Sequence, residues 1–326
     1  MTDPTTLLTE PRIKLVATLE PVAGTRFQPT GFPDLGPATY ASPDDGRRLL
    51  LVESAQSMAN RLEGQLWDEG RDAPIPLIEV LPYLRILDGN GQYLTSSRTE
   101  SHRIASAYVK RARFRNGAAD GEIDGLELIG RRLGLERQRP IDQGRVARAT
   151  FELDPLSLVH GVFFADDRWY GQPKIARALT AFVEAAGVQE AYSGGVKFDH
   201  VSNTGDVRGA GAEGKASKEG FGNVPFPRTE FVAETIEASF VLDVSQIRRY
   251  ALEQREQELL LALALYEVRS LLDEGMRLRT ACDLAVRELR GELPLGFELP
   301  AGDVLESWIS SRVGERRPPL EGTFGA

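Results

Sequence analysis

The sequence predicts an α+β fold in which strands alternate with helices, as in an RRM-like (ferredoxin-like) sheet that carries helical insertions. Two observations support this prediction. Residues 158–202 contain a short apolar run, an amphipathic pattern and a second extended run, which is the strand–helix–strand unit of a mixed layer. The stretch 203–223 is rich in glycine and too poor in apolar residues to join a core, so we expect a projecting arm or a linker.

The N-terminal half is expected to begin with a strand and to continue with alternating helices and strands. Residues 12–19 alternate in polarity, and Leu51, Met58 and Leu62 recur at helical spacing further on. Thr99 fits the N-cap of a later helix. In chain order we expect a strand at 12–19, a loop at 20–46, a helix at 47–67, a strand at 75–87, a helix from Thr99 to about Phe114, a short helix within 120–140 and a strand at 145–153.

The C-terminal half is expected to contain the strand–helix–strand unit, one further strand and a helical end. Pro173 fits the first turn of a helix, and Gly187 fits its end. His160 lies inside the preceding apolar run and is expected to be a hydrogen-bonded core residue. We predict a strand at 158–164, a helix at 173–186, strands at 188–198 and 230–242, helices at 245–275 and 276–291, and a short helix at 303–313.

The charge balance argues only mildly against a nucleic-acid partner. The chain carries 39 Lys and Arg residues against 48 Asp and Glu residues, a net charge of −9. Residues 98–148 nevertheless hold twelve basic residues against seven acidic ones, whereas 228–326 hold twelve against eighteen. A basic middle and an acidic end are compatible with binding to an anionic ligand, provided that the acidic end faces away from it.

Composition also bears on the compartment. Cys282 is the single cysteine, so no internal disulfide can form, and the first ten residues lack the pattern of a secretory signal. The longest apolar run, at 259–266, is too short to cross a bilayer. We therefore expect a cytoplasmic protein that has no membrane partner.

Basic residues gather at the ends of the predicted strand–helix–strand unit. Lys174 and Arg177 are three positions apart, so a helix would place them on one face, and Lys197 and His200 follow where the next strand ends. One interpretation is a set of ordinary solvated cations. The other is a row of contacts to phosphates, held in place by rigid elements and insensitive to base identity.

Two stretches imitate catalytic patterns, and neither pattern is complete. The stretch from Gly209 to Lys215 imitates a phosphate-binding loop, but Ala216 stands where serine or threonine is required. Asp166, Asp167, Asp199, His200 and Asp206 have the composition of a metal or acid–base site. Adjacent aspartates at a strand end are usually a solvated turn, and no spacing typical of metal ligands is present. The sequence therefore predicts no cofactor.

Four segments together carry a resemblance to a known family. They are E-S-A-Q-S-M-A-N-R-L-E at 53–63, S-H-R-I-A-S-A-Y at 101–108, W-Y-G-Q-P-K-I-A-R at 169–177 and G-G-V-K-F-D at 194–199. The chain resembles the backbone subunit of a type I CRISPR surveillance complex (Cascade), of subtype I-G (formerly I-U), within the RAMP superfamily. The C-terminal third contributes no motif to this resemblance.

The resemblance implies a non-catalytic subunit that binds CRISPR RNA. Several copies would line up along one RNA and present its spacer for pairing with target DNA, so that pairing reads the sequence. The large subunit and a Cas-five/Cas-six-type subunit of the complex would be further partners. The implied organisation is a RAMP palm at 12–20, 47–87 and 145–243, a finger-like helical insertion at 88–144, a thumb-like arm at 203–227 and a helical C-terminal part at 244–326.

The resemblance also implies which side chains meet the RNA. The implied RNA-binding residues are Ser57, Asn60, Arg61, His102, Arg103, Gln172, Lys174, Arg177, Lys197, His200, Arg208, Lys215 and Lys218. The main alternative is a metal-dependent ribonuclease on the same RAMP fold, for which Asp166, Asp199 and Asp206 are the candidates. A further alternative is a helical scaffold that meets only protein partners through its C-terminal third.

Overall fold

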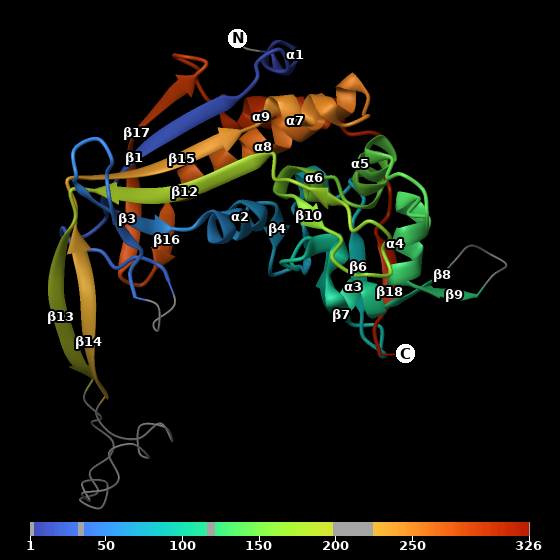
Figure 1. The fold of residues 1–326 in the computed structure, drawn as a ribbon, viewed down its shortest axis with the longest axis horizontal. Coiled ribbons are helices and arrows are strands. Elements are labelled where there is room, and N and C mark those ends of the chain that lie inside the picture. The colour runs from blue at the N-terminus through green and yellow to red at the C-terminus, as the bar shows by residue number, and fades with distance from the viewer. Residues whose placement is uncertain (1–2, 32–35, 116–120, 198–223, 326) are drawn as a thin grey trace, which may run out of the picture.

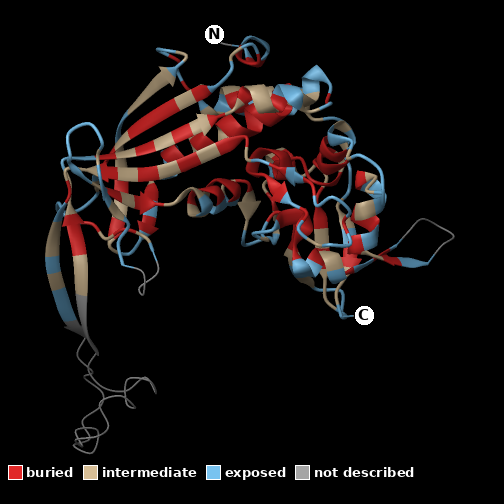
Figure 2. Cartoon of the chain, viewed as in Figure 1, coloured by how far each residue is buried: buried red, intermediate tan, exposed pale blue. Residues whose placement is uncertain are grey.

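The chain forms a mixed α+β structure, as the sequence predicts, with a broad curled sheet at one end and a helical body at the other (Figure 1). The computed structural model describes residues 3–31, 36–115, 121–197 and 224–325. Buried side chains run continuously from the sheet through the central helices into the helical body (Figure 2), so both ends share one core. No helix in these ranges is long and apolar enough to cross a bilayer.

The broad sheet has seven strands, each antiparallel to its neighbours. Buried and less buried side chains alternate along its central strands, so one face is packed and the other is more open. Its order is β16 (Met276–Arg279), β17 (Cys282–Leu293), β1 (Ile13–Pro21), β15 (Thr235–Leu242), β12 (Leu179–Ala186), β3 (Arg48–Glu53) and β2 (Thr39–Ala41).

A long central helix, α8 (Gln254–Glu274), links the sheet to the rest of the molecule. A capping box formed by Glu253 and Glu256 fixes its start, and its middle, from Glu258 to Leu265, is buried without interruption. Because that stretch is apolar almost all round, the helix has to be covered on several sides. The helices that pack against it include α1 (Pro4–Leu7), α2 (Ala55–Gly64), α6 (Leu156–His160), α7 (Val244–Arg249) and α9 (Gly302–Arg312).

The helical body is built around a five-stranded sheet in which the C-terminal strand, β18 (Leu320–Thr323), takes the central place. That strand runs parallel to β6 (Leu84–Leu87) and antiparallel to β8 (Arg113–Arg115). The outer strands are β7 (Tyr93–Ser96) and β9 (Glu122–Asp124). The helices of this body are α3 (Ala107–Arg111), α4 (Gly125–Leu133), α5 (Gln143–Leu153), α6 and the short η1 (Pro76–Ile78) and η2 (Arg103–Ala105).

Three two-stranded pairs complete the described structure. The pairs β4 (Trp67–Asp68) with β5 (Ala73–Pro74) and β10 (Val162–Phe163) with β11 (Lys174–Ile175) are short. The third, β13 (Gln189–Lys197) with β14 (Val224–Val232), is a long ribbon that projects away from the sheet (Figure 1). The ribbon leads to the predicted arm, but residues 198–223 lie outside the described residues.

Several predicted elements are wrong. In two of them, residues that were predicted to be helical form strands. Residues 179–186, predicted as the end of a helix, form β12, because Leu179, Ala181 and Val183 alternate with partly exposed residues. The apolar residues on both faces of this strand imitated a helical period. Residues 276–291, also predicted as a helix, form β16 and most of β17, so the C-terminal part is not wholly helical.

The opposite error occurs further upstream, where helices replace two predicted strands. Residues 145–153 lie in α5, whose N-cap is Asp142, and the predicted strand 158–164 is the end of α6 followed by β10. The predicted helix 47–67 begins with strand β3 and becomes α2 only at Ala55. The predicted strand 230–242 is the end of β14 and all of β15.

The predicted segments 75–87 and 99–114 are each interrupted. The first contains η1 before β6, and the second contains η2 and then α3, whose N-cap is Ser106 rather than Thr99. The predicted elements at 12–19, 188–198 and 303–313 are confirmed as β1, β13 and α9. The predicted helix 245–275 is confirmed in its main part, as α7 and α8, and a short helix within 120–140 is α4.

Candidate nucleic-acid interface

A groove of about 770 Å³ lies where four separate segments of the chain meet. These segments are the first turns of α2, residues 101–103, residues 160–163 and residues 174–180. The predicted RNA-binding residues that line it are Asn60, His102, Arg103, Lys174 and Arg177. Residues that are more than a hundred positions apart in sequence therefore face one concave surface.

Glycine at position 161 allows two of these segments to approach closely. Gly161 follows α6 with a φ of +80°, which side-chain-bearing residues rarely adopt. A Cβ atom there would lie 2.8 Å from the carbonyl oxygen of Ile175 and 2.9 Å from the backbone nitrogen of Arg177. Ala178 N–H donates to the Val159 carbonyl at 2.8 Å, which holds the two segments together. The backbone around Gly161 is therefore a tightly packed floor for the groove.

Two cations of the groove, Lys174 and Arg177, have no carboxylate partner among the described residues. Lys174 and His102 are exposed and Arg177 is half-buried, and in the described parts of the chain none of the three forms an ion pair with a carboxylate. Arg177 Nη1 donates to the backbone carbonyl of Ala55 at 3.2 Å. Burial and the neighbouring Arg103 lower the pKa of Arg177 from its usual value, but a guanidinium stays charged at neutral pH. The groove thus presents two cations, Lys174 and Arg177, that form no ion pair within the described ranges.

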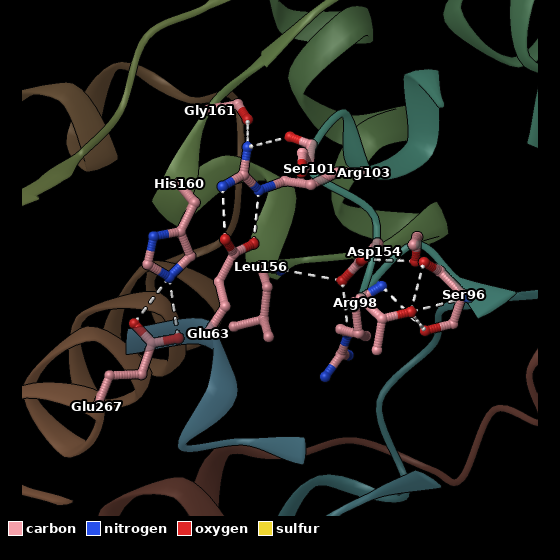
Figure 3. A network of polar contacts seen from close by, with 12 residues as sticks. Glu63, Ser96, Arg98, Ser101, Arg103, Asp154, Leu156, His160, Gly161 and Glu267 are labelled. Atoms are coloured by element: carbon pink, nitrogen blue, oxygen red, sulfur yellow. Dashed lines mark hydrogen bonds and ion pairs between the residues drawn. The ribbon is translucent and has the colours of Figure 1, made fainter. Parts of the chain in front are cut away.

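The groove residues Arg103 and His160 belong to a layer of buried polar pairs (Figure 3). Arg103 donates through Nε and Nη2 to the two carboxylate oxygens of Glu63, both at 2.6 Å, and through Nη1 to the Gly161 carbonyl at 3.0 Å. The Arg103 backbone has a φ of +51°, which is uncommon for a residue with a side chain. In a second buried pair, Arg98 Nε donates to Asp154 Oδ1 at 2.9 Å.

The same layer contains a histidine and a glutamate that are completely buried. His160 Nε2 lies 3.0 and 2.9 Å from the two carboxylate oxygens of Glu267. Burial lowers the pKa of His160 to about 4, and burial raises the pKa of Glu267 well above its ordinary value. Both shifts disfavour charge, so a neutral imidazole that accepts the proton of a neutral carboxyl fits the site. The prediction that His160 is a hydrogen-bonded core residue is confirmed.

Three of the predicted RNA-binding residues lie outside the groove. Arg61 donates to Glu53 at 3.0 Å and to the backbone carbonyls of Arg277 and Leu278, so it ties α2 to strands β3 and β16. The Ser57 N–H donates to Ser54, the N-cap of α2. Gln172 is exposed and donates to the Ala165 carbonyl at 2.6 Å, with a φ of +43°.

The side chains of the remaining predicted residues are not described. Lys197 is the last residue of β13, where only the backbone is described. His200, Arg208, Lys215 and Lys218 lie outside the described residues.

Sequence reasoning missed other side chains that line the groove. They are Gln56 on α2, Ser101 before η2, Phe163 on β10 and Thr180 on β12. Gln56 carried a usable signal, because it lies four positions before Asn60 on a predicted helix. Phe163 carried none, since it stands in an apolar run in which its neighbours Val162 and Phe164 are buried.

Of the three residues offered for a ribonuclease, only Asp166 lies in the described part of the chain. Asp166 accepts hydrogen bonds from Arg168 and Lys110, and the bond from Arg168 is the largest cause that holds its pKa well below the ordinary value. Asp199 and Asp206 lie outside the described residues. Across the described ranges, no group of three or more His, Cys, Asp or Glu residues is placed to hold a metal ion.

The family is decided by a match to one family model. Residues 13–190, more than half of the chain, match the family described as CRISPR-associated protein GSU0053 (Cas_GSU0053). The chain belongs to this CRISPR-associated family. The matched range contains all four segments that form the groove, and it confirms the CRISPR-associated family that the four sequence motifs indicate.

Comparison with solved structures gives weaker likenesses. One similar chain comes from a "CRISPR RNA-guided surveillance complex, pre-nicking", with 13% identity, a TM-score of 0.43, and coverage of 86% of this chain and 75% of that one. Another is described as the crystal structure of Thermofilum pendens Csc2, with 9% identity, a TM-score of 0.31, and coverage of 94% of this chain and 72% of that one. No curated protein matches the chain.

Proposed function

We propose that this chain is a non-catalytic subunit that binds CRISPR RNA, and that the groove holds the phosphate backbone of that RNA. The observation that carries the proposal is the convergence of Lys174, Arg177 and His102 on one concave surface without acidic partners. In a chain with a net charge of −9, two unpaired cations beside an exposed histidine on one concave surface indicate an anionic ligand.

The build of the groove suits a phosphate chain. Rigid elements hold its cations, and Asn60, Ser101 and Thr180 add neutral donors between them. Such side chains bond to phosphate and ribose oxygens and carry no information about base identity. The interface would therefore accept any guide sequence, as a subunit of an RNA-guided complex must.

The finer assignment follows the sequence motifs. We propose a RAMP backbone subunit of a type I-G (formerly I-U) complex, which acts in the cytoplasm and lines up in several copies along one CRISPR RNA. The RNA's spacer would then pair with target DNA, and the large subunit and the Cas-five/Cas-six-type subunit would be its protein partners. The broad sheet corresponds to the palm, and the ribbon β13–β14 leads into a thumb-like arm that would reach the RNA.

A binding and cleavage experiment tests the proposal. The purified chain is mixed with labelled CRISPR RNA in EDTA or in Mg²⁺, retained RNA is measured by filter binding, and RNA integrity is read on a denaturing gel. We expect equal retention in both buffers and intact RNA, including an added complementary RNA. Absence of binding would contradict the proposal, and Mg²⁺-dependent cleavage that is lost in Asp166→Ala would favour the ribonuclease.

A further inference from the structure

An aromatic ring stands exposed among the cations of the groove. Phe163 is 50% exposed, whereas Val162 and Phe164 beside it are buried. The side chain lines the groove and belongs to β10, the strand that follows the tightly packed Gly161. Exposure of a phenylalanine on a rigid element forfeits the stabilisation that burial of an apolar ring would bring.

The partner strand places a cation beside that ring. Phe163 and Lys174 are paired across β10 and β11, and Lys174 Nζ lies 6.0 Å from the centre of the phenyl ring. The backbone of Phe164 donates to the Pro173 carbonyl at 3.1 Å, which extends the contact between the two strands. An open ring and a positive charge are therefore held side by side within a groove that Arg177 also lines.

We propose that Phe163 is a stacking platform for one base of the bound RNA, while Lys174 contacts a phosphate of the same stretch. Single-stranded nucleic acids are commonly held in this way, by aromatic rings that stack on bases beside basic side chains that follow the backbone. Every base has a π face, so stacking does not depend on base identity. The contact therefore fits a groove that binds guides of any sequence. This inference rests on the proposed RNA binding and adds a base contact to it.

The test separates the base contact from the phosphate contact. Affinities are measured by fluorescence anisotropy for two oligomers of equal length, a single-stranded RNA and an abasic ribose-phosphate chain. The variants are Phe163→Leu, Phe163→Trp and Lys174→Ala, and Tyr40→Leu is the control, because Tyr40 is a comparably exposed aromatic that does not line the groove. Thermal melting checks that each variant is folded.

We expect Phe163→Leu to bind normal RNA about 5- to 100-fold more weakly and the abasic chain as tightly as wild type does. Phe163→Trp should keep wild-type affinity, and normal RNA should quench its added fluorescence, whereas the abasic chain should not. Lys174→Ala should lower the affinity for both oligomers equally, and Tyr40→Leu should leave both affinities unchanged.

Two results would overturn the inference, and they are distinguishable from failure of the proposed function. If Phe163→Leu binds normal RNA as tightly as wild type does, the ring does not stack on a base, although the proposed RNA binding is unaffected. If Phe163→Leu weakens both oligomers equally, the ring only shapes the groove. If wild type binds neither oligomer, the proposed function fails, and the inference fails with it.

Discussion

Arg103 and Arg177 line the same groove, yet the structure gives them opposite surroundings. Arg103 is buried and held by both carboxylate oxygens of Glu63, whereas Arg177 is half-buried and bonds only to the Ala55 carbonyl among the described residues. The difference lies in the partner and not in the residue type. A buried layer of polar pairs holds Arg103 in place, whereas Arg177 has no carboxylate partner among the described residues and remains available for an anion.

The largest effect should come from breaking a pair in the buried layer. In Glu63→Ala the Arg103 guanidinium stays buried without its carboxylate, which we expect to cost about 3–5 kcal/mol of unfolding free energy. The matched control is Glu136→Ala, because Glu136 and Arg139 form an exposed pair whose loss should cost about 0–1 kcal/mol. Urea denaturation measures both variants, and equal losses would show that burial of the pair has no special role.

A second change tests the junction between the layer and the groove. Gly161→Ala forces a Cβ atom to within 2.8 Å of the Ile175 carbonyl oxygen and 2.9 Å of the Arg177 nitrogen, at a φ of +80°. We expect a loss of about 1–3 kcal/mol of unfolding free energy. Because Arg177 is displaced, RNA affinity should fall in the variant that remains folded at low temperature. A variant with wild-type stability would contradict the close approach.

A third prediction concerns the pH dependence of the buried layer. Since the folded pKa of His160 is depressed to about 4, its contribution is complete above pH 6.5 and is lost as the pH falls toward 4. The raised pKa of Glu267 acts in the opposite sense, because its contribution is complete below pH 4.5 and is lost as the pH rises. Between pH 4.5 and 6.5 the two groups therefore change the stability in opposite directions as the pH rises.

The variant Glu267→Gln isolates the pH dependence of stability that His160 causes. An amide keeps a donor for His160 Nε2 but does not titrate, so the melting temperature should fall more steeply than in wild type as the pH drops from 6.5 to 4. At alkaline pH the variant should lose less stability than wild type does. Thermal melts across pH 4–9 supply the comparison, and superimposable profiles would mean that Glu267 does not titrate in this range.

Local pattern indicated the α+β class and the family, but it placed several elements wrongly. Phe182 and Val183 imitate a helical stripe, although they sit on opposite faces of β12, since that strand lies inside a wide sheet. The predicted helix 276–291 is likewise the strand β16 and most of the strand β17. In both cases tertiary pairing decided the secondary structure, which a single sequence does not display.

For the candidate site, the sequence located the segments but not the roles of individual side chains. The motifs at 53–63, 101–108 and 169–177 all reach the groove, and Lys174 and Arg177 face it as a pair, although from a strand end and not from a helix. Arg61 and Arg103 belong to the same motifs, yet Glu53 and Glu63 hold them. Which arginine meets which glutamate depends on contacts between distant elements, so composition alone could not separate them.

The central claim, that unpaired cations of the groove meet RNA phosphates, is tested most directly by the salt dependence of binding. Affinity for one single-stranded RNA is measured at several salt concentrations for wild type, Lys174→Ala, Arg177→Ala and the control Arg131→Ala, whose target side chain pairs with Glu127 on α4. Each groove variant should flatten the slope of log affinity against log salt by about 0.7, the value for one phosphate on a single strand. Arg131→Ala should keep the wild-type slope. Unchanged slopes in both groove variants would contradict the account.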